Sequence, residues 1–275
     1  MKLDREKSRK FRMKKHYIPM PYSAYPIPTL IYDYGKPQAA SLYYYKELPS
    51  TNRTAKELFF SQAENNRRFI VLADRQSAGR GRLGRSFFSD GGLYFTCAVP
   101  RGSFSLPPEL ITTAAAAAVC RAITGEGFPV RIKWVNDILL DGKKICGILA
   151  EALSERNSAI GYIVGIGINI GTSDFPEAIA DTAASLPGDP LLKSRVFHRI
   201  IETFYKALNE NPHKLLDYCT EKSFVIGKPI HYFGAADGFG TAIGLDSHGG
   251  LIVKKEDGTT VVLSGGEISI RPTNG

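Results

Sequence analysis

The stretch Gln76-Ser77-Ala78-Gly79-Arg80-Gly81-Arg82-Leu83-Gly84-Arg85, called here the arginine loop, decides how this sequence is interpreted. It joins two apolar runs, 69–73 and 93–99, that are each typical of a buried strand. Glycine lets the main chain approach a ligand closely, and arginine offers a planar, charged fork that fits carboxylate and phosphate oxygens. A loop that alternates the two is a candidate for holding an anion against its own backbone.

The arginine loop alone leaves other interpretations open. Gly79, Gly81 and Gly84 have the spacing of a dinucleotide-binding fingerprint, but that fingerprint has to open a helix, and residues 86–92 are a poor helix start. A solvated surface turn or an arginine-rich RNA-binding segment would also contain these arginines. The loop by itself favours a small anionic ligand no more than it favours a polymer or no ligand.

A second polar cluster is expected around a hairpin. Asp141-Gly142 is a strong two-residue turn signal, and it joins the apolar segments 138–140 and 145–150. The hairpin and the following strand, 160–166, would gather several polar residues at one end of a sheet: Lys133, Asn136, Asp137, Lys144 and Asn169. Cations with one carboxylate at the ends of strands are the composition of a phosphate and metal site.

Six motifs follow one another along the chain: Ser50-Thr51-Asn52, the Gly-Arg-Gly-Arg-Leu-Gly-Arg of 79–85, Lys133-Trp134-Val135-Asn136-Asp137, Lys144 with Gly147-Ile148-Leu149, Gly167-Ile168-Asn169, and Ser264 to Arg271. In order and approximate spacing this series resembles the biotin–protein ligases, from about residue 41 to the C-terminus. Each motif alone is weak, whereas six in order are specific. One departure is Phe87, where many members of the family have tryptophan.

The resemblance implies an α+β fold. It consists of a mixed sheet with helices, like that of class II aminoacyl-tRNA synthetases, followed by a C-terminal SH3-like barrel. The corresponding division is a basic, then Pro/Tyr-rich extension at 1–40, a catalytic domain at 41–222 and the barrel at 223–275. Four or five short strands after Pro229, separated by glycine-containing turns, support the barrel independently.

The residue patterns also predict the helices of the catalytic domain. Thr54 and Glu57 have the spacing of a capping box for a helix that ends near residue 65. An alanine-rich segment, 106–124, is expected to be a helix that ends at Gly125, and 193–222 is expected to form two helices with a break at Asn211-Pro212. The long connection 171–190 is a candidate lid.

The family's reaction has two steps. The carboxylate of biotin attacks the α-phosphate of ATP, which gives biotinyl-5′-AMP and pyrophosphate, and a lysine of a biotin carboxyl carrier domain of a carboxylase then attacks the adenylate. The resemblance therefore implies biotin as substrate, ATP and Mg²⁺ as cofactors, and the carrier domain as protein partner.

By resemblance, the site residues fall into three groups. The catalytic group is Lys144, Arg82 and Asp137, the last being also the candidate metal ligand. The biotin-binding group is Ser50, Thr51, Asn52, Gln76, Gly79, Arg80, Gly81, Arg82, Trp134, Lys144 and Gly147. The ATP-binding group is Arg80, Arg82, Arg85, Lys133, Asn136, Asn169 and Arg271. Whether Asp137 steers magnesium or the incoming lysine is left open.

Composition and charge exclude several classes of protein. No apolar run approaches the roughly 20 residues of a membrane helix, and 43% hydrophobic residues suffice for a core. Residues 1–16 hold eight basic and two acidic residues and so account for +6 of the net charge of +8. Basic character thus belongs mainly to a tail, which argues against specific DNA binding by the remainder. No helix-turn-helix pattern fits the first 40 residues, so the chain resembles ligases without a DNA-binding domain.

The cysteines indicate a reduced, cytoplasmic protein, because Cys97, Cys120, Cys146 and Cys219 have neither metal-site nor Cys-x-x-Cys spacing. Two alternative functions stay open. A lipoate–protein ligase would share the catalytic architecture, although the arginine loop and the barrel favour biotin. A nucleic-acid-binding module would use the basic tail. The sequence leaves the oligomeric state open between monomer and homodimer.

Overall fold

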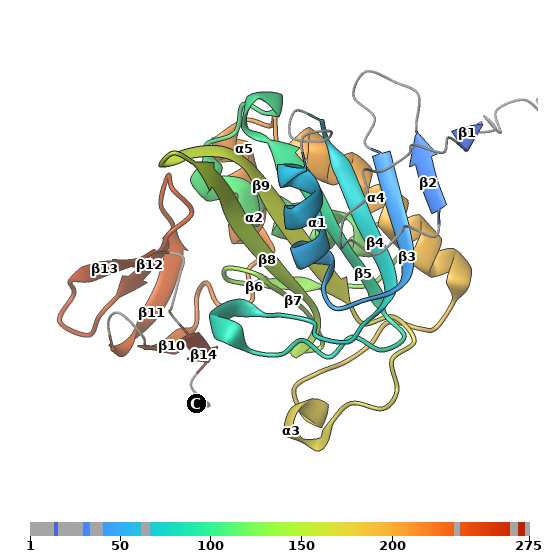
Figure 1. The fold of residues 1–275 in the computed structure, drawn as a ribbon. Coiled ribbons are helices and arrows are strands. Elements are labelled where there is room, and N and C mark those ends of the chain that lie inside the picture. Colours follow the sequence, from blue (N-terminus) through green and yellow to red (C-terminus); the bar gives the residue numbers. More distant parts are fainter. Residues whose placement is uncertain are drawn as a thin grey trace, which may run out of the picture.

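The apolar runs of the sequence become neighbouring strands of one large sheet (Figure 1). The computed structural model describes residues 14–15, 30–33, 41–61, 67–233, 237–264 and 269–272. Nine strands pair in the order β1-β2-β3-β4-β5-β9-β8-β7-β6. They are β1 (Lys14–Lys15), β2 (Leu30–Asp33), β3 (Ser41–Leu48), β4 (Phe69–Gln76), β5 (Leu93–Pro100), β6 (Arg131–Lys133), β7 (Asp137–Leu140), β8 (Lys143–Glu155) and β9 (Ser158–Ile168). The β3–β4 pair is parallel and the others are antiparallel, which confirms the predicted mixed sheet.

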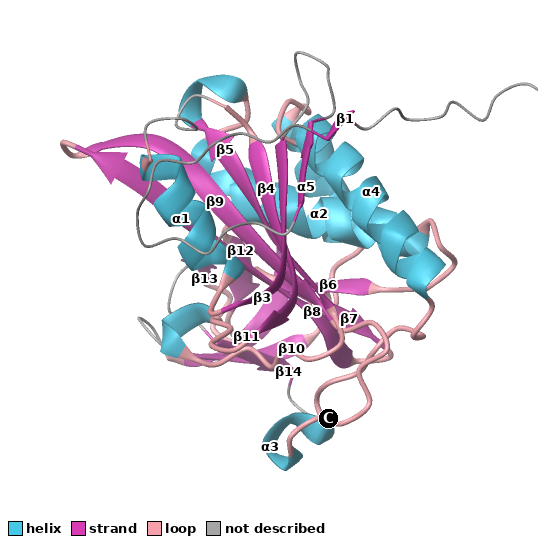
Figure 2. Cartoon of the chain, turned by 45° about the vertical axis from the view of Figure 1, so that its right-hand side comes forward, coloured by secondary structure: helices cyan, strands magenta, loops and turns pink. Residues whose placement is uncertain are grey.

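Helices cover both faces of this sheet (Figure 2). One face carries α1 (Thr51–Phe60), and the other carries α2 (Ile111–Thr124), α4 (Pro190–Ala207) and α5 (Pro212–Glu221). Because alternate residues of a strand point to opposite faces, Phe69 and Val71 pack with α1 while Ile70 joins the core beneath α2. The remaining elements are α3 (Glu177–Ala180) and three 3-10 turns at Arg82–Gly84, Arg101–Ser103 and Pro108–Leu110.

The alanine-rich helix packs closely because its side chains are small. Residues 114–118 of α2 are fully buried between the sheet and α4. At an interior packed to the density of an organic crystal, larger side chains there would force α4 away from the sheet. The break predicted between two helices is also confirmed, since Asn211 caps α5 by accepting from the backbone N–H groups of His213 and Lys214.

The C-terminal segment forms a second, five-stranded antiparallel sheet, which confirms the predicted SH3-like barrel. Its strands pair in the order β13-β12-β11-β10-β14. They are β10 (Pro229–Phe233), β11 (Gly238–Leu245), β12 (Leu251–Lys254), β13 (Thr260–Leu263) and β14 (Ser269–Pro272). A separate small core that includes Ile230, Tyr232 and Val253 holds the strands together.

Two predicted helix starts are wrong. The capping box at Thr54 and Glu57 does not form, because α1 begins three residues earlier, at Thr51, with Ser50 at the N-cap position, and ends at Phe60. Thr54 is buried within α1, and Glu57 pairs instead with Arg53 one turn before it. The alanine-rich helix begins at Ile111 rather than at residue 106, because Pro107 and Pro108 first direct the chain into a 3-10 turn.

Two short segments of the N-terminal extension extend the large sheet. β2 pairs with β3, and β1 pairs with β2, so part of the predicted extended arm is an edge of the catalytic sheet. The rest of residues 1–40 lies outside the described residues. Among the helices that the structure describes, none is long and apolar enough to cross a membrane.

Candidate functional site

A pocket of about 200 Å³ opens between the start of α1, the arginine loop and the strands β7, β8 and β9. Most of the residues predicted from the sequence line it: Ser50, Thr51, Asn52, Gln76, Arg80, Gly81, Arg82, Arg85, Lys133, Trp134, Asn136, Asp137, Lys144 and Gly147. Segments separated by up to 117 residues in the chain, from Ser50 to Gly167, thus meet in one place. Of the predicted second polar cluster, all members except Asn169 line the pocket.

A β-bulge directs Lys144 into this pocket. In the β7–β8 pair, Ile138 faces Cys146 and Leu139 faces Lys144, so Ile145 is an extra residue on β8. An extra residue reverses the face to which neighbouring side chains point. Ile145 and Cys146 are accordingly both buried, and Lys144 lines the pocket together with Gly147. The turn before the bulge has positive φ at Asp141 (50°) and Gly142 (78°), as the sequence predicts for a tight hairpin.

Both the side chain and the backbone of Lys144 make contacts that fix its position. Its Nζ lies 2.6 Å from Asp137 Oδ1, across the hairpin. Its backbone N–H donates to the carbonyl of Thr182 (2.8 Å), and its carbonyl accepts from the N–H of Ala184 (2.9 Å). The connection predicted to be a lid is therefore fastened, at residues 182–184, to the strand that carries Lys144.

The arginine loop folds over the pocket through Arg82. Its Nη1 donates to Asn136 Oδ1 (3.1 Å), and Asn136 Nδ2 donates in turn to the carbonyl of Ile148 (3.0 Å). Burial lowers the pKa of the Arg82 guanidinium from its ordinary value, and the neighbouring Asp137 carboxylate partly offsets this. Arginine stays charged at neutral pH, so Arg82 presents a partly desolvated cation to the pocket.

A polar floor lies at the other end of the pocket, at the start of α1. Gln76 Oε1 accepts from both the backbone N–H (2.8 Å) and the hydroxyl (3.1 Å) of Thr51, and Gln76 Nε2 donates to Ser89 Oγ (3.0 Å). The hydroxyl of Thr96 contacts Thr51 Oγ1 (2.9 Å) and Asn52 Oδ1 (2.7 Å). Such a floor suits a ligand with a polar ring, because buried polar groups need hydrogen-bond partners.

Several residues of the site were missed in the sequence. Thr96 lies within the apolar run that became β5, Ser89 lies in the loop before it, and Glu151 follows the Gly147 motif on β8. A single threonine in an apolar strand is an ordinary β-branched residue and gives no signal of a polar contact. The pairing of β5 and β8 with β9 and the packing of α1 bring Thr96 and Glu151 to Asn52, whereas Ser89 meets Gln76 from the loop before β5.

Phe87 rests on a pair of glycines in the sheet. Gly147 and Gly167 are paired residues of β8 and β9. An added Cβ atom would lie 2.9 Å from the Phe87 ring at Gly147 and 2.5 Å from it at Gly167. The glycines thus make room for an aromatic wall next to Lys144. Gly79 has a similar role at the other end of the loop, because its Cβ would lie 2.5 Å from the Phe87 carbonyl oxygen.

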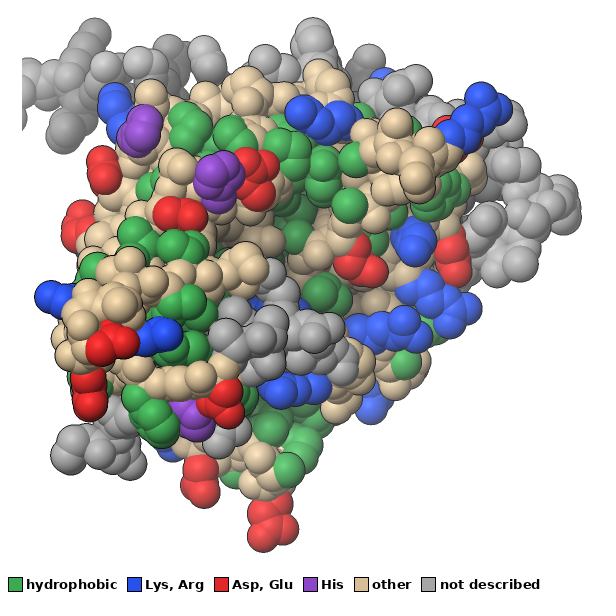
Figure 3. Space-filling view, turned by 90° about the vertical axis from the view of Figure 1, so that its left-hand side faces the viewer, with side chains coloured by type: hydrophobic (Ala, Val, Ile, Leu, Met, Phe, Trp, Pro, Cys, Tyr) green, Lys and Arg blue, Asp and Glu red, His purple; other side chains and the backbone are tan. Residues whose placement is uncertain are grey.

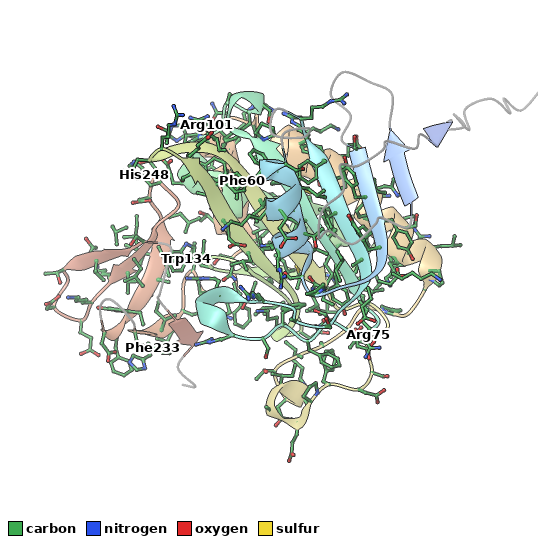
Figure 4. All side chains as sticks on the ribbon, in the orientation of Figure 1. Phe60, Arg75, Arg101, Trp134, Phe233 and His248 are labelled. Atoms are coloured by element: carbon green, nitrogen blue, oxygen red, sulfur yellow. The ribbon has the colours of Figure 1, made fainter. Side chains whose placement is uncertain are left out.

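Trp134 connects the pocket to the C-terminal barrel. Its indole Nε1 donates to the carbonyl of Gly249 (2.8 Å), and its ring packs against the barrel core. Figure 4 shows Trp134 at the junction between the large sheet and the barrel strands. Since Trp134 also lines the pocket, the barrel and the site share one side chain.

Three predicted residues are not found at the pocket. Gly79 packs behind the loop, as described above. Asn169 is buried, and its Nδ2 donates to the carbonyl of Ala184 (3.0 Å), so here its amide fastens the 182–184 segment. For Arg271 the structure describes the backbone, in β14, but not the side chain, and residues 265–268 of the same motif lie outside the described residues. The nucleotide contacts of Asn169 and Arg271 stay predictions.

The pocket carries a strong excess of positive charge. Among the residues that the structure describes, its lining includes Arg80, Arg82, Arg85, Lys133 and Lys144, against the single carboxylate of Asp137. Figure 3 shows Lys and Arg side chains gathered on one part of the face that it draws. Within the described residues, no group of three or more His, Cys, Asp or Glu side chains could enclose a metal ion. One carboxylate fits a magnesium ion held mainly by phosphate oxygens and water.

Sequence comparisons place the chain among proteins that ligate biotin or lipoate. The profile of the Biotin/lipoate A/B protein ligase family matches residues 44–169, and that of the Biotin protein ligase C terminal domain matches residues 234–271. The bifunctional ligase/repressor BirA of Bacillus subtilis is 33% identical over 240 residues, which are 81% of this chain and 72% of that protein. The biotin–[acetyl-CoA-carboxylase] ligase of Mycobacterium tuberculosis is 27% identical over 72% of this chain and 77% of its own length.

Solved structures agree with the sequence comparisons. The biotin protein ligase of Aquifex aeolicus in complex with biotin and ATP superposes with a TM-score of 0.71 at 30% identity. The superposition covers 84% of this chain and 99% of that one.

Proposed function

The chain belongs to the biotin protein ligase family, and on that premise we propose that the pocket joins biotin to AMP and then transfers the biotinyl group to a lysine of a biotin carboxyl carrier domain. The activity is ATP-dependent biotinylation of a protein. One observation carries the assignment to this pocket. In the described part of the chain, the pocket is lined by five cationic side chains and one carboxylate, beside a polar floor that suits a ureido ring.

The first step brings two anions together. A carboxylate oxygen of biotin attacks the α-phosphorus of ATP, the bond to the β-phosphate oxygen breaks, and pyrophosphate leaves with biotinyl-5′-AMP remaining. We assign Lys144 to the charge that moves between carboxylate and phosphate, and Arg80, Arg82 and Arg85 to the phosphate oxygens. Positioning and charge stabilisation supply most of the catalysis in such transfers.

Magnesium enters this scheme with the nucleotide. It would neutralise the leaving pyrophosphate, and Asp137 is the pocket carboxylate that could steer it. Because Asp137 Oδ1 lies 2.6 Å from Lys144 Nζ, its other assigned role is to hold Lys144 and later to accept a proton from the incoming lysine.

In the second step the lysine amine of the carrier attacks the acyl carbon of the adenylate, AMP leaves, and the amine loses a proton. No covalent intermediate with the enzyme is needed. The four buried, free cysteines are typical of a reducing compartment, so we place the enzyme in the cytoplasm.

The test is biotin-dependent exchange of pyrophosphate into ATP, run in parallel with lipoate. Exchange with biotin is the expected result. Exchange with lipoate alone would favour the lipoate–protein ligase alternative, against which the C-terminal barrel already counts. No exchange, together with salt-sensitive binding of nucleic acid by the chain without residues 1–16, would favour a binding module.

A further inference from the structure

We propose that Asp246, in the C-terminal barrel, is a positioning residue that determines where the Trp134 side chain lies in the wall of the pocket. It acts through the turn 246–250, which joins β11 to β12. The inference rests on the proposed function, because it takes Trp134 as part of the wall that contacts biotin.

The first step is the edge of the Trp134 indole. Nε1 is the only polar atom of this side chain and can only donate, and it donates to the carbonyl of Gly249 (2.8 Å). The rest of the ring lines the pocket and packs against the barrel core. Apolar packing has no preferred direction, whereas a hydrogen bond does, so this bond fixes one edge of the ring. The position of the Gly249 carbonyl therefore determines the position of the indole.

The second step is the direction of that carbonyl. Asp246 Oδ1 accepts from the backbone N–H groups of His248 (2.9 Å) and Gly250 (2.7 Å). The N–H of Gly250 and the carbonyl of Gly249 belong to one planar trans peptide, in which they point in opposite directions. Because Asp246 holds the N–H on one side of this peptide, the carbonyl on the other side is directed to Trp134.

The third step is the contact of the turn with the catalytic domain. Gly249 is buried with positive φ (80°), and an added Cβ would lie 3.0 Å from Leu110 Cδ2 and 3.1 Å from Thr113 Oγ1. Leu245, just before the turn, packs against both the core beneath α2 and the barrel core. Figure 1 shows this turn reaching from the barrel towards α2 and α5. The turn is thus held between the two cores, and its conformation is transmitted to Trp134.

The test uses fluorescence, because Trp134 is the only tryptophan of the chain and its emission reports this side chain alone. Asp246→Ala removes the acceptor that orients the peptide, whereas Asp246→Asn keeps a side-chain oxygen at the same place. Asp257→Ala is the matched control. Asp257 Oδ1 likewise accepts from a backbone N–H, that of Thr259 (2.9 Å), in the barrel hairpin between β12 and β13.

Asp246→Ala should move the emission of folded protein to longer wavelength, because the indole N–H exchanges its partner in the protein for water. In pyrophosphate exchange it should raise the KM for biotin by roughly fivefold, the effect of about one lost hydrogen bond. The kcat should stay unchanged, as expected when binding common to the ground state and the transition state is lost. Asp246→Asn should resemble wild type in emission and in KM. Asp257→Ala should lower the thermal midpoint as Asp246→Ala does, but leave emission and KM unchanged.

A double-mutant cycle tests whether Asp246 acts through Trp134. Trp134→Phe removes the N–H donor and keeps an aromatic ring, so its KM for biotin should also rise. Without the donor, the direction of the Gly249 carbonyl no longer affects the pocket wall. Adding Asp246→Ala to Trp134→Phe should therefore raise the KM no further.

Additive effects in the cycle would overturn the inference. Wild-type emission in Asp246→Ala would overturn it too, as would an equal emission shift in Asp257→Ala, because general loosening of the barrel would then explain the result. The emission measurements need no activity. A wild-type protein without biotin-dependent exchange would therefore overturn the proposed function, while the emission would still report whether the turn positions Trp134.

Discussion

At the scale of single residues, Lys144 is the most consequential side chain of the pocket, because its position depends on a bulge, an ion pair and two backbone hydrogen bonds. Lys144→Ala should slow adenylate formation by roughly 100-fold or more, as expected when a charge-stabilising contact of the transition state is lost. The variant would also remove the ion-pair partner of Asp137, beside two anionic substrates. Single-turnover adenylation measures the effect, and Lys143→Ala, on the exposed neighbour, is the control. A near-normal rate would remove Lys144 from the mechanism.

Arg82 is predicted to retain the reactive intermediate. It fastens the arginine loop to Asn136 and carries a partly buried charge next to Asp137. Arg82→Gly should still form biotinyl-5′-AMP but release it faster, because the loop loses its contact with the opposite wall of the pocket. The measurement is biotin labelling of albumin in the presence of biotin, ATP and magnesium, with Arg156→Gly, at an exposed arginine of the turn after β8, as the control. Comparable adenylate formation without increased albumin labelling would show that Arg82 is not the retaining group.

The sequence indicated which residues gather at this pocket better than it indicated the contacts between them. The motifs predict glycine, arginine and lysine at the pocket, because an anion is bound by cationic side chains and by a backbone that can approach it closely. The bulge at Ile145, the contact of Arg82 with Asn136 and the polar contacts of Thr96 do not follow from it. They depend on which strand pairs with which, and a single sequence does not specify that.

At the scale of elements, α1 packs on β9 through two glycines. A Cβ at Gly161 would lie 2.4 Å from the ring of Phe59, and one at Gly165 would lie 2.1 Å from Asn52 Oδ1. Gly165→Ala should therefore push the start of α1 away from the sheet. We expect a loss of about 1–3 kcal/mol in the free energy of unfolding, typical of overpacking, and weaker biotin binding.

The control for Gly165→Ala is Gly244→Ala, in a strand of the barrel, where an added Cβ would meet no atom within 4 Å. Urea unfolding and biotin titration of both variants are the measurements. If Gly165→Ala keeps the stability and the biotin affinity of wild type, the close approach of Asn52 to the sheet is not required.

The boundaries of elements were harder to predict than their existence. The strands, the alanine-rich helix and the barrel follow from hydrophobic period and turn residues. The start of α1 does not, because Ser50 makes no side-chain capping bond and burial of Thr51 and Thr54, rather than capping chemistry, determines where this helix begins. The connection 171–190 was predicted as a lid, but its fastening to Lys144 depends on backbone pairing that side-chain patterns do not indicate.

At the scale of the whole molecule, the two described segments of the N-terminal extension and the strands that carry Lys144 and Asp137 lie at different ends of the large sheet. β1 and β2 form one edge, whereas β8, β7 and β6 form the other. A chain that starts at Tyr17 should keep full ligase activity, because it loses only the two residues of β1 and the basic tail. A chain that starts at Ser41 loses the pairing of β2 with β3 and should unfold at a lower temperature. Loss of activity in the Tyr17 chain at unchanged thermal stability would show that the tail contributes to the site.

The four cysteines predict how the stability of the folded protein depends on pH, because all of them are buried and free: Cys97, Cys120, Cys146 and Cys219. Burial raises the thiol pKa of each, in Cys219 from 9.0 to about 12. Between those values the unfolded chain releases thiol protons that the folded protein keeps, so the unfolded state gains stability as pH rises. The free energy of unfolding should fall above pH 9 by up to about 1.4 kcal/mol per thiol and pH unit.

Urea unfolding at increasing pH measures this slope, and Cys219→Ala should make it shallower. The decline that remains belongs to the other thiols and to buried tyrosines such as Tyr45, because burial raises the pKa of Tyr45 to about 12. An identical slope in Cys219→Ala, or rapid reaction of the native protein with a thiol reagent at pH 8, would contradict the burial of these thiols.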